Sequence, residues 1–318
     1  MSALEKTKNH SYQIIFCLIM SFFFIVSCGS NHNDQSLSLN EYITNNRPLI
    51  TAHRGYAATA PENTLAAFEA AVVAGADATE FDVHRSGDGT LVVIHDETVD
   101  RTTNGTGAVA ELSDAYLRSL DAGSWKGEQF QGEQIPTLEE TLVYLKKCGM
   151  VALLEIKTPS IVDDVVAMLY ATGMEERTLI VTFVESAVVE IKERHPEIPA
   201  LLFLPPSCMT GTAEEKTAKI MIKAEEIGTK DVGPFAFQYD ALDKNAIEKI
   251  TVNEDPGELV LGLDSETLSI LHEHGYRIDA WTVDSEENIR DLIQANVDIL
   301  TTNYLERAIA AKNESLGE

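Results

Sequence analysis

Two histidines stand where an acid/base catalyst would be expected. His53 and His95 each follow a short apolar run that is typical of a β-strand. Imidazole titrates near neutral pH, so one ring can take a proton from an attacking nucleophile while the other gives a proton to a leaving alkoxide. Either histidine alone is more often a hydrogen-bonded structural residue. The catalytic interpretation therefore depends on the groups that accompany them.

Three carboxylates lie inside apolar, strand-like runs. Glu80 and Asp82 alternate within one run, and Glu155 is enclosed in another. A carboxylate is costly to bury unpaired, so Glu155 should be ion-paired or bound to a metal. Together the three acids fit the oxygen-rich shell of Ca²⁺ or Mg²⁺ and lack the nitrogen and sulfur ligands that zinc prefers. The structural alternative is a salt bridge from Glu155 to Lys157 or Arg54.

Two basic residues and one tryptophan complete the candidate set. Arg54 follows His53 directly, and Lys157 lies two residues after Glu155. Arginine grips phosphate oxygens in a bidentate manner and lysine holds them as a point charge. Trp281 could stack on the alcohol part of a substrate, although an aromatic residue in a strand is as often part of the core.

Nine candidate strands, most of them separated by amphipathic helical segments, must position these side chains. This alternation predicts a parallel sheet covered by helices, and the length suits one eight-stranded TIM (β/α)8 barrel of about 250 residues. In such barrels reactive groups project from the carboxyl ends of the strands. The ninth strand belongs either to a hairpin or to the periphery. The candidates are residues 48–52, 78–83, 91–95, 151–156, 179–183, 200–204, 235–239, 277–283 and 297–302.

The second and third candidate strands are joined too closely for a crossover helix. Only residues 84–90 separate them, with Asp88 and Gly89 as a turn signal, which favours an antiparallel hairpin. A turn centred between residues 87 and 88 would place Glu80 opposite His95 and Asp82 opposite Val93. The register then puts both acids and the histidine on one face of the hairpin.

After the third strand comes a polar insertion of about residues 98–136, long enough to be a functional loop or small subdomain. The other histidines of the predicted domain do not end apolar strands, and we expect them at the surface. They are His84, His195, His272 and His274.

The N-terminus is typical of an export signal. Two lysines precede a short apolar run, which ends at Cys28 in the tetrad Ile-Val-Ser-Cys. The tetrad resembles a bacterial lipobox, in which the cysteine is diacylated; an ordinary signal peptide with an incidental cysteine is the alternative. We expect a signal peptide at 1–27, a tether at 28–46 and one domain at 47–318. The protein would then be membrane-anchored and periplasmic or cell-surface.

The charge of the chain bears on its partners. Fifty-one acidic residues against 24 basic ones leave a net charge of −27, which disfavours nucleic acid and anionic membrane surfaces. A small substrate or a cation is the more natural partner. Cys148 and Cys208 remain after the signal and the lipid site, and either a disulfide or two free thiols is compatible with export.

Seven motifs, in order along almost the whole mature domain, resemble the glycerophosphodiester phosphodiesterase family and the wider group of phosphatidylinositol-specific phospholipase C-like barrels. The resemblance implies His53 and His95 as the acid/base pair, metal ligation by the three carboxylates, and phosphate contacts from Arg54 and Lys157. The motifs are AHRG with PENT at 52–64, EFDV at 80, DGTLVVIHD at 88, RTTNGTG at 101, IPTLEE at 135, EIK at 155 and AWTVD at 280.

The chain departs from that family at two places. The family usually has Asn where Asp284 stands and a TD-P close where this chain has Thr302, Asn303 and Tyr304. Both positions are expected to lie outside the metal and proton-transfer set and to bear on the choice of alcohol.

The resemblance implies metal-dependent hydrolysis of glycerophosphodiesters to sn-glycerol 3-phosphate and an alcohol. The nucleophile is water or the substrate's own hydroxyl. The rivals are a phospholipase acting on intact lipids, which would need an apolar lip at the barrel mouth, and a non-catalytic binding lipoprotein. A zinc amidohydrolase would need an HxH strand motif, which is absent from the sequence.

Overall fold

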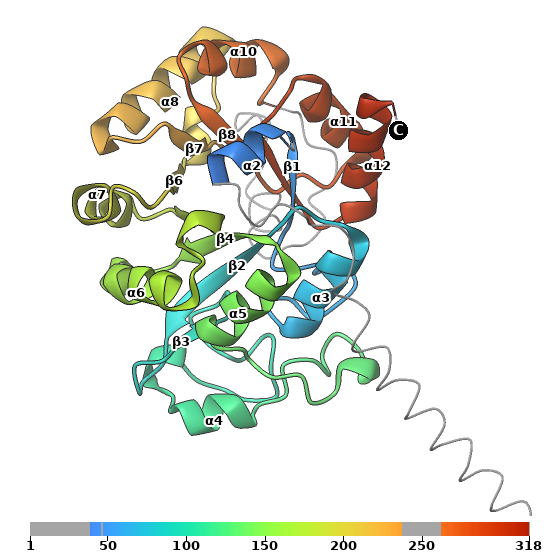
Figure 1. The fold of residues 1–318 in the computed structure, drawn as a ribbon, viewed down its shortest axis with the longest axis vertical. Helices are drawn as coiled ribbons and strands as arrows, with labels where there is room; N and C mark the ends of the chain where they lie inside the picture. Colours follow the sequence, from blue (N-terminus) through green and yellow to red (C-terminus); the bar gives the residue numbers. More distant parts are fainter. Residues whose placement is uncertain (1–38, 46, 237–261, 318) are drawn as a thin grey trace, which may run out of the picture.

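The barrel expected from the sequence is confirmed by a computed structural model, which describes residues 39–45, 47–236 and 262–317 (Figure 1). Eight parallel strands close on themselves through the β1–β2 pairing, in the order β1-β2-β4-β5-β6-β7-β8-β9. The ninth strand, β3, pairs antiparallel with β2 and with no other of the nine strands, so the hairpin is the source of the extra candidate. The strands are β1 (Leu49–Ala52), β2 (Ala78–Arg85), β3 (Leu91–Val93), β4 (Val151–Ile156), β5 (Thr178–Thr182), β6 (Ala200–Phe203), β7 (Asp231–Gly233), β8 (Arg277–Ala280) and β9 (Ile299–Thr302).

Helices surround the barrel and bury their apolar faces on it (Figure 1). Their ends follow local chemistry: Thr137 caps α5 in a reciprocal capping box with Glu140, and Gly75 ends α3 in the left-handed conformation. The helices around the strands are α3 (Leu65–Ala74), α5 (Leu138–Cys148), α6 (Val162–Thr172), α7 (Glu185–Arg194), α8 (Ala213–Ile227), α10 (Ser265–Glu273), α11 (Glu286–Gln294) and α12 (Leu305–Leu316). Among the residues that the structure describes, no helix has the length and apolar character to cross a bilayer.

The helix α2 (Leu39–Asn45) folds a part of the chain that was expected to be tether. Its side chains Leu39, Tyr42 and Ile43 are buried together with inward-facing strand residues such as Leu49 and Ile299. The barrel interior therefore extends its apolar packing onto α2, and the ordered domain begins before residue 47. The rest of the predicted tether and the predicted signal peptide lie outside the described residues.

One acidic side chain lies inside the barrel away from the other charged groups. Asp279 on β8 is fully buried, and its Oδ1 accepts a hydrogen bond of 2.9 Å from Thr301 Oγ1. Its Oδ2 has no hydrogen-bond partner among the described residues, and neither does the buried hydroxyl of Thr51. Burial raises the pKa of Asp279 to about 7, against the smaller opposing effect of the Thr301 hydrogen bond.

The hairpin exists, but its predicted register is wrong by one residue. Val83, not Asp82, pairs with Val93. The reason is the turn, in which the amide of Ser86 donates to the carbonyl of Thr90, so that the turn is centred on Asp88 itself. A one-residue shift would turn His95 to the other face of a continued ladder. β3 ends at Val93, and one further ladder bond runs from the Ile94 amide to the Asp82 carbonyl at 3.0 Å; the chain leaves the ladder before His95, so strand register does not decide where His95 points.

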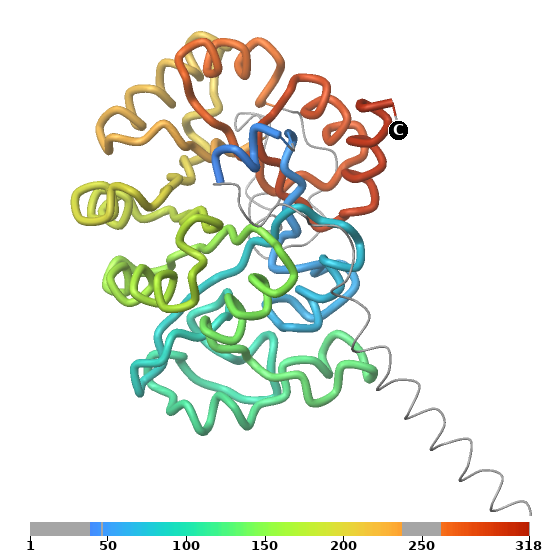
Figure 2. Tube along the Cα trace, viewed as in Figure 1, coloured from blue at the N-terminus to red at the C-terminus, as the bar shows by residue number. Residues whose placement is uncertain are grey.

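The insertion forms a small subdomain beside the hairpin, visible as the turquoise and green part of the tube in Figure 2. It contains α4 (Asp114–Ser119) and has its own apolar cluster, in which Leu117 and Leu120 cover Val92 and Ile94. The chain returns to the barrel where the amide of Val93 donates to Pro136. The insertion therefore covers the face of the hairpin that carries Val92 and Ile94.

Three further details differ from or complete the sequence analysis. The seventh strand is β7, earlier than the predicted 235–239, of which 237–239 lie outside the described residues; Phe235 makes only an isolated bridge to Trp281. The apolar pattern does not reveal this strand because it is only three residues long and ends in glycine. Glycine is needed at position 233 because a side chain there would collide with the ring of Phe203. Cys148 and Cys208 are both buried, and no disulfide joins them to each other.

Candidate active site

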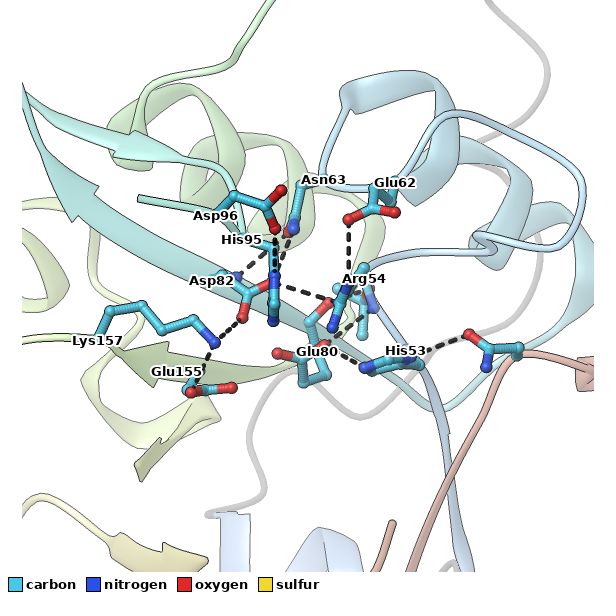
Figure 3. Close-up of polar contacts among 12 residues, drawn as sticks. His53, Arg54, Glu62, Asn63, Glu80, Asp82, His95, Asp96, Glu155 and Lys157 are labelled. Carbon is cyan, nitrogen blue, oxygen red and sulfur yellow. Dashed lines mark hydrogen bonds and ion pairs between the residues drawn. The ribbon is translucent and has the colours of Figure 1, made fainter. Parts of the chain in front are cut away.

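The candidate residues from β1, β2, β4 and the segment after β3 converge at the carboxyl end of the barrel (Figure 3). His53 and Arg54 follow β1 directly, in a turn where Arg54 (φ 52°) and Gly55 (φ +76°) are both left-handed. A side chain on Gly55 would lie 2.6 Å from the Cβ of Ala67 at the start of α3. Glycine is therefore required for the turn to reach α3 and aim the Arg54 side chain inward.

Three buried carboxylates form the centre of the site. Oxygens of Glu80, Asp82 and Glu155 all lie within 4.8 Å of one another. Burial first, and then the charges of the other two acids, raise the pKa of Glu80 well above its ordinary value; burial also raises that of Glu155. Such a concentration of buried negative charge disfavours ionisation unless a cation compensates it. The oxygen-only donor set therefore fits a hard divalent cation.

Lys157 supplies part of the compensating charge. Its Nζ lies 2.7 Å from Asp82 Oδ1 and 2.7 Å from Glu155 Oε1. Burial alone would raise the pKa of Asp82, but the positive charges of Lys157, His95 and Arg54 outweigh it and lower that pKa well below the ordinary value. The salt bridge offered as the structural alternative for Glu155 is thus present, within a cluster of three acids that has one adjacent ammonium group.

Arg54 is enclosed among acids. It is 4% exposed, its Nη1 donates to Glu62 Oε1 at 3.0 Å, and its Nε lies 3.7 Å from Asp82 Oδ2. Its backbone amide donates to Glu80 Oε2 at 2.9 Å. Arg54 therefore links the turn after β1 to two members of the carboxylate cluster.

His53 is held as a neutral imidazole. Its Nδ1 lies 2.9 Å from Asn303 Oδ1, and its Nε2 lies 4.0 Å from Glu80 Oε2. Burial, reinforced by the Arg54 charge, lowers the pKa of His53 to about 3. A neutral ring with one free nitrogen is able to accept a proton. Asn303, expected to lie outside the proton-transfer set, is in direct contact with it.

His95 is held by two hydrogen bonds, one to its ring and one to its backbone carbonyl. Its Nδ1 lies 2.7 Å from Asp96 Oδ1, and its backbone carbonyl bonds His84 Nε2 at 3.1 Å. His84 is therefore buried and not at the surface as expected, because it lies opposite Val92 on the covered face of the hairpin. A carboxylate only accepts hydrogen bonds, so Asp96 makes His95 Nδ1 a donor and leaves Nε2 for the substrate.

The insertion contributes an arginine to the same network. Arg101 makes two hydrogen bonds to Asp96 and two to Glu62, at 2.7 to 2.9 Å. Burial alone would raise the pKa of Asp96, but the hydrogen bonds from His95 and Arg101 lower it far below the ordinary value. Arg101 thereby connects Asp96, which contacts His95, to Glu62, which contacts Arg54.

Several of these residues were not among the sequence candidates. Asn63, named above only as part of the PENT motif, donates from Nδ2 to Asp82 Oδ2 at 2.7 Å and accepts from the Asp82 amide at 3.2 Å. Its left-handed backbone (φ 58°) is a signal that appears only in the structure. Glu62, Asp96 and Arg101 belong to the PENT, IHD and RTT motifs, whose charges give no indication of partners.

Trp281 lies half-buried in an aromatic cluster at the carboxyl ends of β5, β6 and β8. Its ring centroid is 5.2 Å from that of Phe183 and 4.8 Å from that of Phe203, and its Nε1 donates to the Gly233 carbonyl at 2.7 Å. Phe183 is 49% exposed. These rings are far apart in the sequence and come together because β5, β6 and β8 end at the same rim of the barrel.

Comparison with known proteins is in accord with this geometry. A model of the glycerophosphoryl diester phosphodiesterase family matches residues 53–307. A glycerophosphodiester phosphodiesterase of Caldanaerobacter subterraneus is 34% identical over 83% of this chain and 97% of its own length. A putative one of Bacillus subtilis is 36% identical over 80% of this chain and 94% of its own length. A solved Oleispira antarctica phosphodiesterase in complex with the product sn-glycerol-3-phosphate is 26% identical, with a TM-score of 0.66 over 85% of this chain and 98% of that one.

Proposed function

This chain belongs to the glycerophosphoryl diester phosphodiesterase family, and we infer that it hydrolyses glycerophosphodiesters to sn-glycerol 3-phosphate and an alcohol. The observation that carries this inference is the cluster of three buried carboxylates, flanked by two histidines and two cationic side chains at the mouth of the barrel. This arrangement brings acid, base and compensating charge to one point, which the hydrolysis of a charged diester requires.

We propose that Glu80, Asp82 and Glu155 hold a divalent cation, Ca²⁺ or Mg²⁺. Their mutual distances and the raised pKa values of two of them support this assignment. A cation bound there supplies positive charge against the negative charge that develops on the phosphoryl oxygens. Arg54 and Lys157 are proposed to contact the nonbridging oxygens, because both ammonium and guanidinium groups already face the cluster.

We assign the two proton transfers to different histidines. His53 is buried and neutral, so its free nitrogen takes the proton from the nucleophile, whether water or the glycerol hydroxyl of the substrate. His95 is the more exposed ring, and Asp96 occupies its Nδ1, so we assign its Nε2 as the donor of a proton to the leaving alkoxide. Phosphorus-31 NMR of the reaction distinguishes the nucleophiles, because attack by the substrate hydroxyl produces a cyclic phosphate first.

The decisive experiment is a head-group panel of glycerophosphodiesters, assayed for glycerol 3-phosphate with Ca²⁺ and with Mg²⁺. We expect wild-type turnover with one ion and none in excess EDTA, and a loss of about 100-fold or more in kcat for His53→Gln. Near-normal turnover of that variant would refute the assignment of His53. Full activity in EDTA would refute the metal. A non-catalytic binding protein would release no product under any condition.

A second candidate, a phosphodiesterase acting on intact lipids, is favoured by one observation. Phe183 is about half exposed beside Trp281, which gives the barrel mouth the apolar lip that such an enzyme would need. Release of choline or phosphocholine from glycerophosphocholine but not from micellar lysophosphatidylcholine would exclude it.

We propose that Cys28 is diacylated and anchors the exported protein to a membrane, in the periplasm or at the cell surface. The apolar run that ends at the lipobox-like tetrad supports this proposal. In cells, Cys28→Ser should move the full chain from the membrane fraction to the soluble fraction. Retention in the membrane fraction would refute the anchor.

A further inference from the structure

Asn303 contacts His53 although the two residues are 250 positions apart in the sequence. It follows β9, while His53 follows the neighbouring strand β1, and the two side chains meet through Asn303 Oδ1 and His53 Nδ1 at 2.9 Å. On its other side, Asn303 Nδ2 donates to Asp284 Oδ2 at 2.8 Å. The amide is thus placed between an imidazole and a carboxylate.

Asp284 is fixed in position by bonds that do not involve the histidine. Its Oδ1 accepts from the backbone amide of Asn303 at 2.8 Å and from Thr302 Oγ1 at 3.1 Å. Its backbone carbonyl accepts from Arg307 Nη1 at 2.6 Å. Its carboxylate therefore presents Oδ2 to the Asn303 side chain in a defined place.

The direction of the hydrogen bonds follows from the chemistry of the three groups. A carboxylate only accepts, so the NH₂ group of Asn303 must face Asp284. The amide oxygen must then face His53, and an amide oxygen only accepts, so His53 Nδ1 must carry the ring proton. His53 Nε2 is left unprotonated, on the side of the ring that lies 4.0 Å from Glu80. With the amide reversed, Nδ1 would accept and Nε2 would carry the proton.

We propose that Asp284 and Asn303 are positioning residues that select the tautomer of His53, and thereby keep Nε2 available as the proton acceptor. Asp284 acts without touching the histidine, by setting the orientation of one amide. This inference rests on the proposed function for its kinetic consequence, but the tautomer itself is measurable without any substrate.

The kinetic test compares single and paired substitutions. Asp284→Asn allows the Asn303 amide to reverse, so kcat should fall by about 10-fold to 100-fold with KM little changed. Asn303→Leu removes the acceptor and should lower kcat at least as much. Asp284→Asn combined with Asn303→Asp restores an obligate acceptor beside His53, and its kcat should return to within about 5-fold of the wild type. Asp121→Asn is the matched control, because Asp121 is a loop carboxylate that likewise accepts backbone N–H groups, in the insertion.

The direct test is ¹⁵N NMR of histidine-labelled protein with Mg²⁺, with the His53 signals identified by their absence in His53→Gln. We expect a protonated Nδ1 and an unprotonated Nε2 in the wild type and in the paired variant, and a mixture of tautomers in Asp284→Asn. A wild-type ring protonated at Nε2, or an unchanged tautomer and kcat in Asp284→Asn, would overturn the inference. If the tautomers behave as expected while the wild type turns over no diester, the proposed function fails and the positioning role stands.

Discussion

Replacing Asp279 by asparagine should stabilise the protein at alkaline pH and much less at acidic pH. Asp279 is fully buried, its pKa is raised from 3.8 to about 7, and no other charge contributes to that shift. Below pH 3.8 the carboxyl is neutral in the folded and the unfolded chain and costs nothing. Between pH 3.8 and 7 only the unfolded chain ionises, so stability is lost as the pH rises, and above pH 7 the loss is constant.

The magnitude follows from the width of that window. Each pH unit in which only the unfolded state ionises costs about 1.4 kcal/mol. The window is about three pH units wide at pH 8 and about one at pH 5, which corresponds to penalties of about 4 and about 1.5 kcal/mol. Asparagine cannot ionise, and its side-chain oxygen can still accept from Thr301. Any cost of burying its NH₂ group is the same at both pH values.

The assay is urea unfolding of the wild type and Asp279→Asn at pH 5 and at pH 8. The stabilisation by the substitution should be about 2.5 kcal/mol larger at pH 8 than at pH 5. Asp121→Asn serves as control: hydrogen bonds from Ser124 and from backbone amides lower the pKa of Asp121, so its contribution is already complete at pH 5 and should not change up to pH 8. Equal effects of Asp279→Asn at the two pH values would refute the reasoning.

Three other predictions concern the site. Ca²⁺ or Mg²⁺ added to chelator-treated protein should raise Tm, because the ion relieves repulsion among buried carboxylates, and an equal rise in Asp82→Asn would contradict the proposed ligand set. Arg101→Met removes the hydrogen bonds to Asp96 and Glu62 and should lower kcat by roughly 10-fold. An unchanged kcat in steady-state assays would contradict a role for the insertion. Phe183→Ser should raise KM for diesters with apolar alcohols by about 2-fold to 10-fold; a KM that changes equally for all head groups would rule out a contact with the alcohol.

The barrel and the convergence of the side chains that lie in or end its strands were predictable from the sequence because both depend on local pattern. Apolar runs that alternate with amphipathic helices specify a parallel sheet, and a polar residue that ends such a run must emerge at the rim. His53, Glu80 and Glu155 could therefore be placed at one end of the barrel without knowledge of any contact. The short strand β7 escaped because only Val232 gives it an apolar signature.

Contacts between residues distant in sequence were decided by the tertiary structure. The hairpin register depended on one residue in the turn, and the orientation of His95 on where the chain leaves the ladder. The pairing of Asn303 with His53 spans 250 residues and exists because closing the barrel makes the last strand the neighbour of the first. The sequence by itself determined which residues gather at the carboxyl end of the barrel, because strand ends are a local property. Which nitrogen of His53 carries the proton, and the burial of Asp279 away from any opposite charge, depend on barrel closure, which only the folded chain defines.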